Sequence, residues 1–114
     1  MATAIKKVAI LGCDFDLDEC ADIATHGCIA GVPGFTYHVE ILEAYDEYES
    51  IIMDTLDVWA DELGADSAME MIIDTLNRRS IHPDMDAVKE MAVWMYVEKL
   101  AYDFCLEEGH KDFV

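Results

Sequence analysis

Apolar residues recur at helical spacing through most of the chain, and glycine, proline and capping residues separate the helices that this spacing predicts. Between about residues 36 and 63, apolar side chains return every three or four positions, at Ile41, Tyr45, Tyr48, Ile52, Leu56, Trp59 and Leu63. This spacing predicts one apolar stripe on a long amphipathic helix, which Gly64 is expected to end. A bend is expected within residues 45–49, because two tyrosines and three acidic residues lower the helix preference there.

Two shorter helices are predicted from their start signals. Asp16 and Glu19 have the spacing of a capping box, which predicts a helix over residues 17–26 that Gly27 stops. Ser67 and Glu70 repeat this spacing and predict a second helix that ends around residue 79. The side chains expected on the buried side of this second helix are Met69, Ile72, Ile73 and Leu76.

The last predicted helix has a centre that is apolar on every side. Pro83 suits its first turn, Asp84 and Asp86 complement its positive end, and Gly109 follows its end near Glu108. Residues 92–97 read AVWMYV and contain no charged side chain. Such a segment is expected at the centre of a bundle or across a subunit interface.

The pattern leaves the structure of the first residues open. Val8 to Leu11 is a run of four apolar residues, too short to decide between strand and helix. No linker or repeat separates the helices that follow. The predicted fold is therefore all-α, or α with one short N-terminal strand, in the form of a compact bundle of about four helices and a single domain covering residues 1–114.

Acidic residues outnumber basic ones, 25 Asp and Glu against 7 Lys and Arg, and the formal net charge is −18. This charge disfavours contact with nucleic acid or an anionic membrane and favours a basic protein partner. The N-terminal apolar run is shorter than that of a signal peptide, and no stretch is long enough to span a membrane. We therefore expect a cytoplasmic protein with reduced cysteines.

The polar side of the long helix carries acidic residues at helical spacing. They are Glu40, Glu43, Glu47, Asp54, Asp57 and Asp61. On a straight helix they form one stripe of roughly 31 Å, with neighbouring carboxylates about 5 to 6 Å apart. A second acidic cluster near the N-terminus comprises Asp14, Asp16, Asp18 and Glu19, followed by Asp22.

The uniform sign of this stripe favours recognition over solubility alone. Like charges three or four positions apart destabilise a helix, whereas a mixture of Lys and Glu would stabilise it. The hypothesis is that the carboxylates imitate nucleic-acid phosphates and occupy a Lys/Arg-lined groove on a partner. The alternative is that the acidity only keeps the protein soluble.

Two sequence patterns suggest sites with recognisable chemistry, and neither is complete. Residues 8–18 resemble the opening motif of the haloacid dehalogenase phosphatases, which implies Asp14 as nucleophile, Asp16 as acid/base and magnesium as cofactor. That resemblance covers eleven residues, whereas the remainder of the chain reads as helices rather than the doubly wound sheet those enzymes need. The four residues Cys13, Cys20, His26 and Cys28 lack the close Cys-x-x-Cys pairs of a structural zinc site, so no metal or cofactor is predicted.

Four segments together resemble a family of short acidic bacteriophage and prophage proteins. They are His26-Gly27-Cys28-Ile29-Ala30-Gly31, Gly34-Phe35-Thr36-Tyr37, Ala44-Tyr45-Asp46-Glu47-Tyr48 and the Trp- and Tyr-rich run from Val93 to Ala101. The resemblance spans about residues 18–102 and implies a phage origin and a helical fold. It leaves open whether the loop from His26 to Gly34 is a contact or only a tight corner.

These observations predict a non-enzymatic, phage-encoded inhibitor of the anti-CRISPR or antirestriction type. Its partner would be a basic nucleic-acid-binding host protein, such as a CRISPR effector or a restriction nuclease, bound by DNA mimicry. One alternative is a structural or assembly homodimer formed through the Met- and Trp-rich last helix. The other is a small magnesium-dependent phosphohydrolase that uses Asp14 and Asp16.

Overall fold

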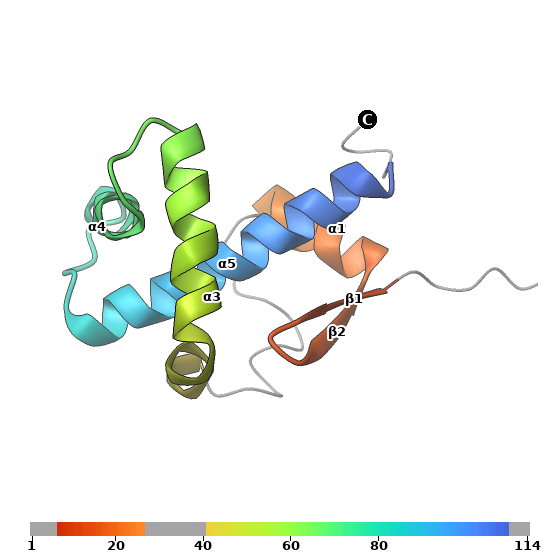
Figure 1. Ribbon diagram of the computed structural model, residues 1–114, viewed down its shortest axis with the longest axis horizontal. Helices are drawn as coiled ribbons and strands as arrows, with labels where there is room; N and C mark the ends of the chain where they lie inside the picture. Colours follow the sequence, from red (N-terminus) through yellow and green to blue (C-terminus); the bar gives the residue numbers. More distant parts are fainter. Residues whose placement is uncertain (1–6, 27–40, 110–114) are drawn as a thin grey trace, which may run out of the picture. The chain divides into compact units, whose positions relative to one another are not determined.

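The computed structural model describes residues 7–26 and 41–109, which form four helices and one hairpin (Figure 1). The contacts between residues divide the chain into two units. The first comprises Met1–His38 and Val97–Val114, and the second comprises Val39–Tyr96. The helix α5 (Met85–Glu107) contributes residues to both units.

The first unit begins with a β-hairpin. Strand β1 (Lys7–Ile10) pairs antiparallel with β2 (Cys13–Asp16), and Ile10 lies opposite Cys13 beside the turn. The two turn residues, Leu11 and Gly12, have φ values of 52° and 82°, as a two-residue type I′ turn requires. Leu11 is nevertheless buried, so its side chain gains apolar burial in return for an unfavourable backbone conformation.

Helix α1 (Leu17–His26) follows the hairpin directly and begins with the predicted capping box. The Asp16 carboxylate accepts a hydrogen bond from the Glu19 backbone N–H at 2.8 Å, and the Glu19 carboxylate accepts one from the Asp16 N–H at 3.3 Å. Together they satisfy two backbone donors at the point where the strand becomes a helix. The buried apolar side chains of this unit are Ile10, Leu11, Phe15, Cys20, Ala21, Ile23, Val97, Ala101, Phe104 and Cys105.

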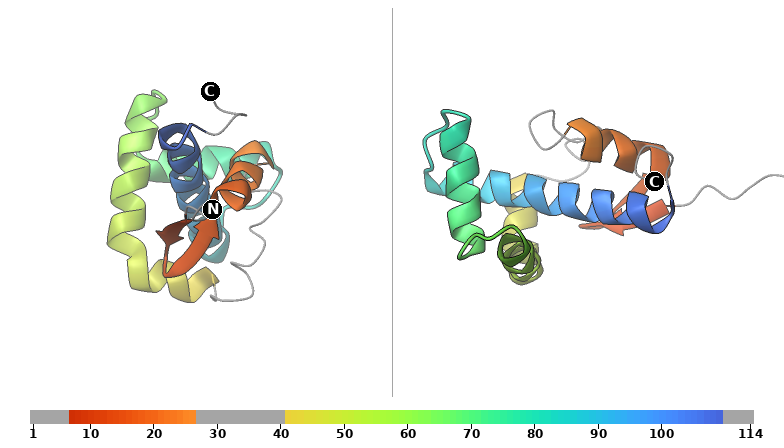
Figure 2. Two further views of the ribbon diagram at one scale, coloured as in Figure 1. Left: turned by 90° about the vertical axis from the view of Figure 1, so that its right-hand side faces the viewer. Right: turned by 90° about the horizontal axis from the view of Figure 1, so that it is seen from above.

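The second unit is built around α3 (Ile41–Glu62), which bends at Tyr48 (φ −115°, ψ 18°). The first turns of α3 therefore run in a different direction from the rest, as Figures 1 and 2 show. This confirms the bend expected at residues 45–49. Beyond the bend α3 is regular, and it packs against α4 (Ala68–Arg78).

Both of these helices end with a residue in the left-handed conformation. At the end of α3, Gly64 has φ +83°, its N–H bonds to the Asp61 carbonyl, and the Ala65 N–H bonds to the Ala60 carbonyl. This is a Schellman motif, and it confirms that Gly64 ends the helix. After α4 the same pair of bonds forms with Ser80 (φ 59°) in the place of the glycine.

The last helix, α5, is capped by Asp84, whose carboxylate accepts a hydrogen bond from the Ala87 N–H at 2.8 Å. Pro83 therefore lies outside the helix and not in its first turn as predicted. Residues 91–97 are all buried, in agreement with a segment that is apolar on every side. No described helix is both long enough and apolar enough to cross a bilayer.

The structure confirms the prediction of a mostly helical fold with a short N-terminal strand, and it corrects several details. A second strand, β2, accompanies the expected one. Leu63 is exposed, because the chain leaves the helix there. On α4 the prediction is confirmed for Ile72 and Leu76, whereas Met69 is exposed and Ile73 is only half-buried. Ala68 and Met71 are buried in their place. The single-domain organisation stays a prediction beside the two units described above.

Candidate functional site

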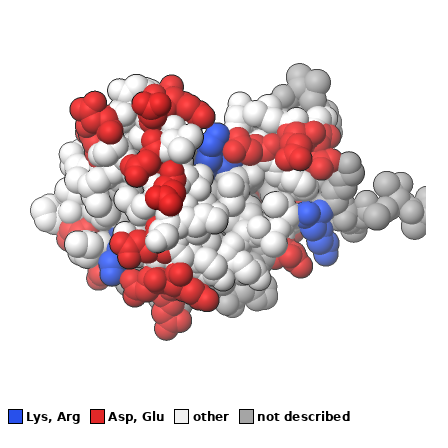
Figure 3. Space-filling view, viewed as in Figure 1, with Lys and Arg blue, Asp and Glu red and all other residues white. Residues whose placement is uncertain are grey.

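Acidic side chains follow the outward side of α3, where red atoms run along the helix in Figure 3. Of the six predicted contact residues on this helix, the exposed ones are Glu43, Glu47, Asp54, Asp57 and Asp61. Glu40 lies outside the described residues. The structure thus brings most of the predicted acidic stripe to the surface of one helix.

The bend at Tyr48 divides this stripe into two parts. Glu43 and Glu47 precede the bend, whereas Asp54, Asp57 and Asp61 follow it on a regular helix. The spacing of seven residues between Glu47 and Asp54 therefore does not keep them on one straight row. The predicted continuous stripe is corrected to two acidic segments that point along different directions (Figures 1 and 2).

One acidic residue of the stripe has a structural role. Asp57 Oδ1 accepts a hydrogen bond of 2.8 Å from the backbone N–H of Ala68, the first residue of α4. Ser67 caps the same helix through its hydroxyl, which accepts from the Glu70 N–H at 3.1 Å. A carboxylate at this point stabilises α4 by a hydrogen bond and by its charge at the positive end of the helix.

The stripe also lies beside an ion pair that joins α3 to α5. Lys89 Nζ lies 3.2 Å from a carboxylate oxygen of Asp46 and 5.5 Å from the centre of the Tyr45 ring. By contrast, the described part of the chain gives no hydrogen bond or ion pair to the side chains of Glu43, Glu47, Asp54 and Asp61. These four carboxylates are the members of the stripe available to a partner.

Two apolar side chains share the acidic side of α3 and were missed by the sequence analysis. Ile51 is 51% exposed and Val58 is 62% exposed, whereas Ile52 and Leu56 on the opposite side are fully buried. The helical spacing alone would have found them, because positions 51, 54, 58 and 61 are three, four and three residues apart. We call these four residues, Ile51, Asp54, Val58 and Asp61, the α3 row.

The N-terminal acidic cluster is divided between a strand and a helix. Asp14 is exposed on β2, and Asp18 is exposed in the first turn of α1. Asp16 and Glu19 are partly buried and are engaged in the capping box at the start of α1. Asp16, the second aspartate of the Asp-x-Asp motif, therefore stabilises the start of α1.

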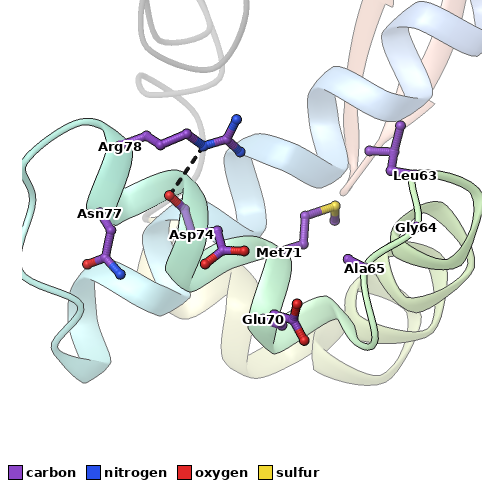
Figure 4. A pocket seen from close by; sticks show the side chains of 8 residues that line it. All are labelled: Leu63, Gly64, Ala65, Glu70, Met71, Asp74, Asn77 and Arg78. Atoms are coloured by element: carbon purple, nitrogen blue, oxygen red, sulfur yellow. Dashed lines mark hydrogen bonds between the residues drawn. The ribbon is translucent and has the colours of Figure 1, made fainter.

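A surface hollow of about 570 Å³ lies beside the end of α3 (Figure 4). Residues 63–65 form one wall, and Glu70, Met71, Asp74, Asn77 and Arg78 of α4 form the other. The Arg78 Nε donates a hydrogen bond of 3.4 Å to the Asp74 carbonyl of its own helix. The four polar side chains of this wall are exposed, so the hollow lacks the enclosed polar groups of a small-molecule site.

The described thiols do not form a reactive site. Cys20 and Cys105 are both fully buried in the first unit and are not disulfide-bonded. Burial raises the pKa of the Cys20 thiol to about 12, with smaller contributions from Cys105 and from the nearby carboxylates of Glu19 and Asp16. Such a thiol stays protonated at neutral pH and is a poor nucleophile or metal ligand.

A metal site requires several histidine, cysteine or carboxylate side chains that lie close together. In residues 7–26 and 41–109, no three such side chains come close enough together to hold an ion. The side chains of Cys13 and His26, and all of Cys28, lie outside the described part. The surface of α3 is therefore the candidate site that the geometry supports best.

Comparison with known proteins identifies a family for this chain. The model of a family described as "Domain of unknown function (DUF7222)" matches residues 14–110. No curated protein and no solved structure matches the sequence. The matched range begins in β2 and extends beyond the end of α5, so it includes every described helix. The chain therefore belongs to the DUF7222 family.

Proposed function

We propose that this chain is a phage-encoded inhibitor that binds a basic nucleic-acid-binding protein of the bacterial host. Carboxylates on α3 take the place of nucleic-acid phosphates in a Lys/Arg-lined groove of a CRISPR effector or a restriction nuclease. The observation that carries the proposal is the exposure of four carboxylates without a protein partner among the described residues, namely Glu43, Glu47, Asp54 and Asp61. The net charge of −18 favours association with a positive groove over distances of about 10 Å.

The bend of α3 modifies the way in which this mimicry operates. A straight stripe would follow one strand of a duplex, whereas two short acidic segments at an angle present charge in two directions. A groove that holds bent or single-stranded nucleic acid suits this arrangement, because its basic residues also follow a curved path. The segment from residue 49 to Asp61 is regular and provides the longer of the two contacts.

The other two candidate functions have less support. A homodimer through the centre of α5 would require side chains that are already buried within the chain, including Trp94 and Met95. A phosphohydrolase would require Asp16 as a free acid/base, whereas its carboxylate caps α1. Binding through the acidic surface of α3 requires neither the exposure of buried side chains nor the loss of a helix cap.

The proposal is tested by competition for DNA. The chain is immobilised and exposed to a nuclease-treated bacterial lysate at low salt, and the proteins eluted by rising salt are identified. Each basic protein recovered is then assayed for DNA binding with and without the chain, by gel mobility shift. We expect the chain to displace DNA from its partner and to lose affinity steeply as salt is added.

Two variants of equal net charge provide the control. The first carries Glu43→Lys, Glu47→Lys and Asp54→Lys on α3, and the second carries Asp74→Lys, Glu90→Lys and Glu107→Lys at exposed positions elsewhere. Both lower the negative charge by six. We expect only the first to release the DNA-binding protein. Equal inhibition by both variants, or recovery of partners that keep their DNA, would refute the proposal.

A further inference from the structure

The α3 row alternates apolar and acidic side chains along one side of a regular helix. Its members are three, four and three residues apart, so their side chains point in nearly the same direction. Ile51 and Val58 are separated by two turns, or about 10.5 Å along the axis. Both are more than half exposed.

These apolar side chains are unnecessary for imitation of phosphates. A pure charge mimic would gain solubility from polar residues at these two positions, and Gln is a better helix former than Ile or Val. Apolar anchors seven residues apart are, however, typical of helices that dock into a protein surface. The α3 row therefore combines the features of a charge mimic with those of a helix-docking face.

The charges beside the apolar pair restrict which occupant can cover it. A second copy of this chain would place its own Asp54 and Asp61 against the same residues, and a chain with net charge −18 repels another copy. Nucleic acid and an anionic lipid surface are repelled for the same reason. A protein helix with Lys or Arg beside an apolar side meets both the charges and the exposed Ile and Val.

We infer that the α3 row docks a basic amphipathic helix of the partner protein. Its two apolar members contact the apolar side of that helix, and its two aspartates pair with Lys or Arg at the edge. The inference rests on the proposed function, since it concerns the same surface, and it adds the chemistry of the partner. The basic helix would belong to the wall of the partner's nucleic-acid groove.

The experiment uses two synthetic helical peptides of equal positive charge as probes. One carries Leu along one side and Lys on the other, and in the second each Leu is replaced by Gln. Their affinities for the full chain are measured by isothermal titration calorimetry at low and moderate salt. We expect the Leu/Lys peptide to bind about tenfold more tightly than the Gln/Lys peptide, which corresponds to about 1.4 kcal/mol.

Variants of the chain test whether the α3 row causes this difference in affinity between the two peptides. In Ile51→Gln/Val58→Gln, both peptides are expected to bind with the lower affinity, because the apolar contact is lost and the charges remain. Met85→Gln is the matched control, since Met85 is 67% exposed but lies on α5. It is expected to keep the tenfold preference. Circular dichroism of each variant confirms that the helices are retained.

The outcomes separate this inference from the proposed function. If Ile51→Gln/Val58→Gln keeps the preference for the Leu/Lys peptide, the docking of an apolar side on α3 is wrong, whereas charge mimicry remains. If the α3 charge-reversal variant binds the Gln/Lys peptide as well as the control reversal variant does, the acids of α3 are not the contact and the proposed function is wrong.

Discussion

Acidic residues at similar positions in the sequence have two different roles in this structure. Asp57 and Asp54 lie one turn apart on α3, and both are exposed. Asp57 caps the next helix through a hydrogen bond to Ala68, whereas Asp54 has no hydrogen bond or ion pair among the described residues. Some of the acidic residues that give the chain its negative charge therefore stabilise the fold, whereas others are available for binding.

The largest effect on stability is expected from the loss of the Asp57 cap. Asp57→Ala removes a charged acceptor from the start of α4 and leaves the Ala68 N–H without it, so the free energy of unfolding should fall by about 1–2 kcal/mol. Urea unfolding followed by circular dichroism measures the change. Asp54→Ala is the matched control and should stay within about 0.5 kcal/mol of the parent. Equal losses of stability in Asp57→Ala and Asp54→Ala would show that Asp57 has no greater structural role than Asp54.

A second structural carboxylate is Asp16 at the start of α1. Asp16→Ala is expected to cost about 1 kcal/mol, because the Glu19 N–H loses its acceptor and the capping box is broken. Faster hydrogen exchange at the Glu19 amide reports this loss locally. Asp14→Ala, on the exposed side of the same strand, should leave that amide protected. An unchanged exchange rate in Asp16→Ala would show that the cap is not formed in solution.

These structural roles differ in how far the sequence reveals them. The caps of Asp16 and Ser67 were predictable, because each joins residues three positions apart and depends on local spacing. The cap formed by Asp57 was not, since it bonds to a residue eleven positions later and depends on how α3 packs against α4. From spacing alone, Asp57 is therefore grouped with its neighbours as a binding residue.

The other differences between prediction and structure have several causes. β2 was missed because CDFD has a single large apolar residue, and the Leu-Gly turn before it lacks the Asn or Asp that marks most tight hairpins. Leu63 continues the apolar spacing of α3, yet the Schellman motif at Gly64 turns the chain before Leu63 can pack. The bend at Tyr48 was expected from local composition. That the bend divides the acidic stripe could not be predicted, because this depends on the directions in which the two parts of α3 run.

A smaller effect is expected from Asp46, which pairs with Lys89 at the surface. Asp46→Ala should lower the free energy of unfolding by about 0.5 kcal/mol, because exposed ion pairs contribute little. A double-mutant cycle with Lys89→Met measures the coupling between them, which should weaken as salt is added. The contact of Lys89 with the Tyr45 ring does not involve Asp46 and is expected to remain in Asp46→Ala. A coupling above about 2 kcal/mol would contradict this expectation and would show that Asp46 stabilises the fold as strongly as Asp57 does.

The smallest effect has the opposite sign and concerns the acids of the α3 row. Asp54 lies three residues before Asp57, and Asp61 lies four residues after it, so each forms a like-charged pair with the carboxylate that caps α4. Asp54→Asn/Asp61→Asn relieves both pairs and is expected to raise the free energy of unfolding by a few tenths of a kcal/mol per pair at low salt. The gain should disappear at high salt, because screening already weakens the repulsion in the parent protein. Urea unfolding at the two salt concentrations tests this, with Asp74→Asn/Glu107→Gln as a control of equal charge. A loss of stability in Asp54→Asn/Asp61→Asn would mean that these residues have structural partners, and they would then no longer be available for recognition.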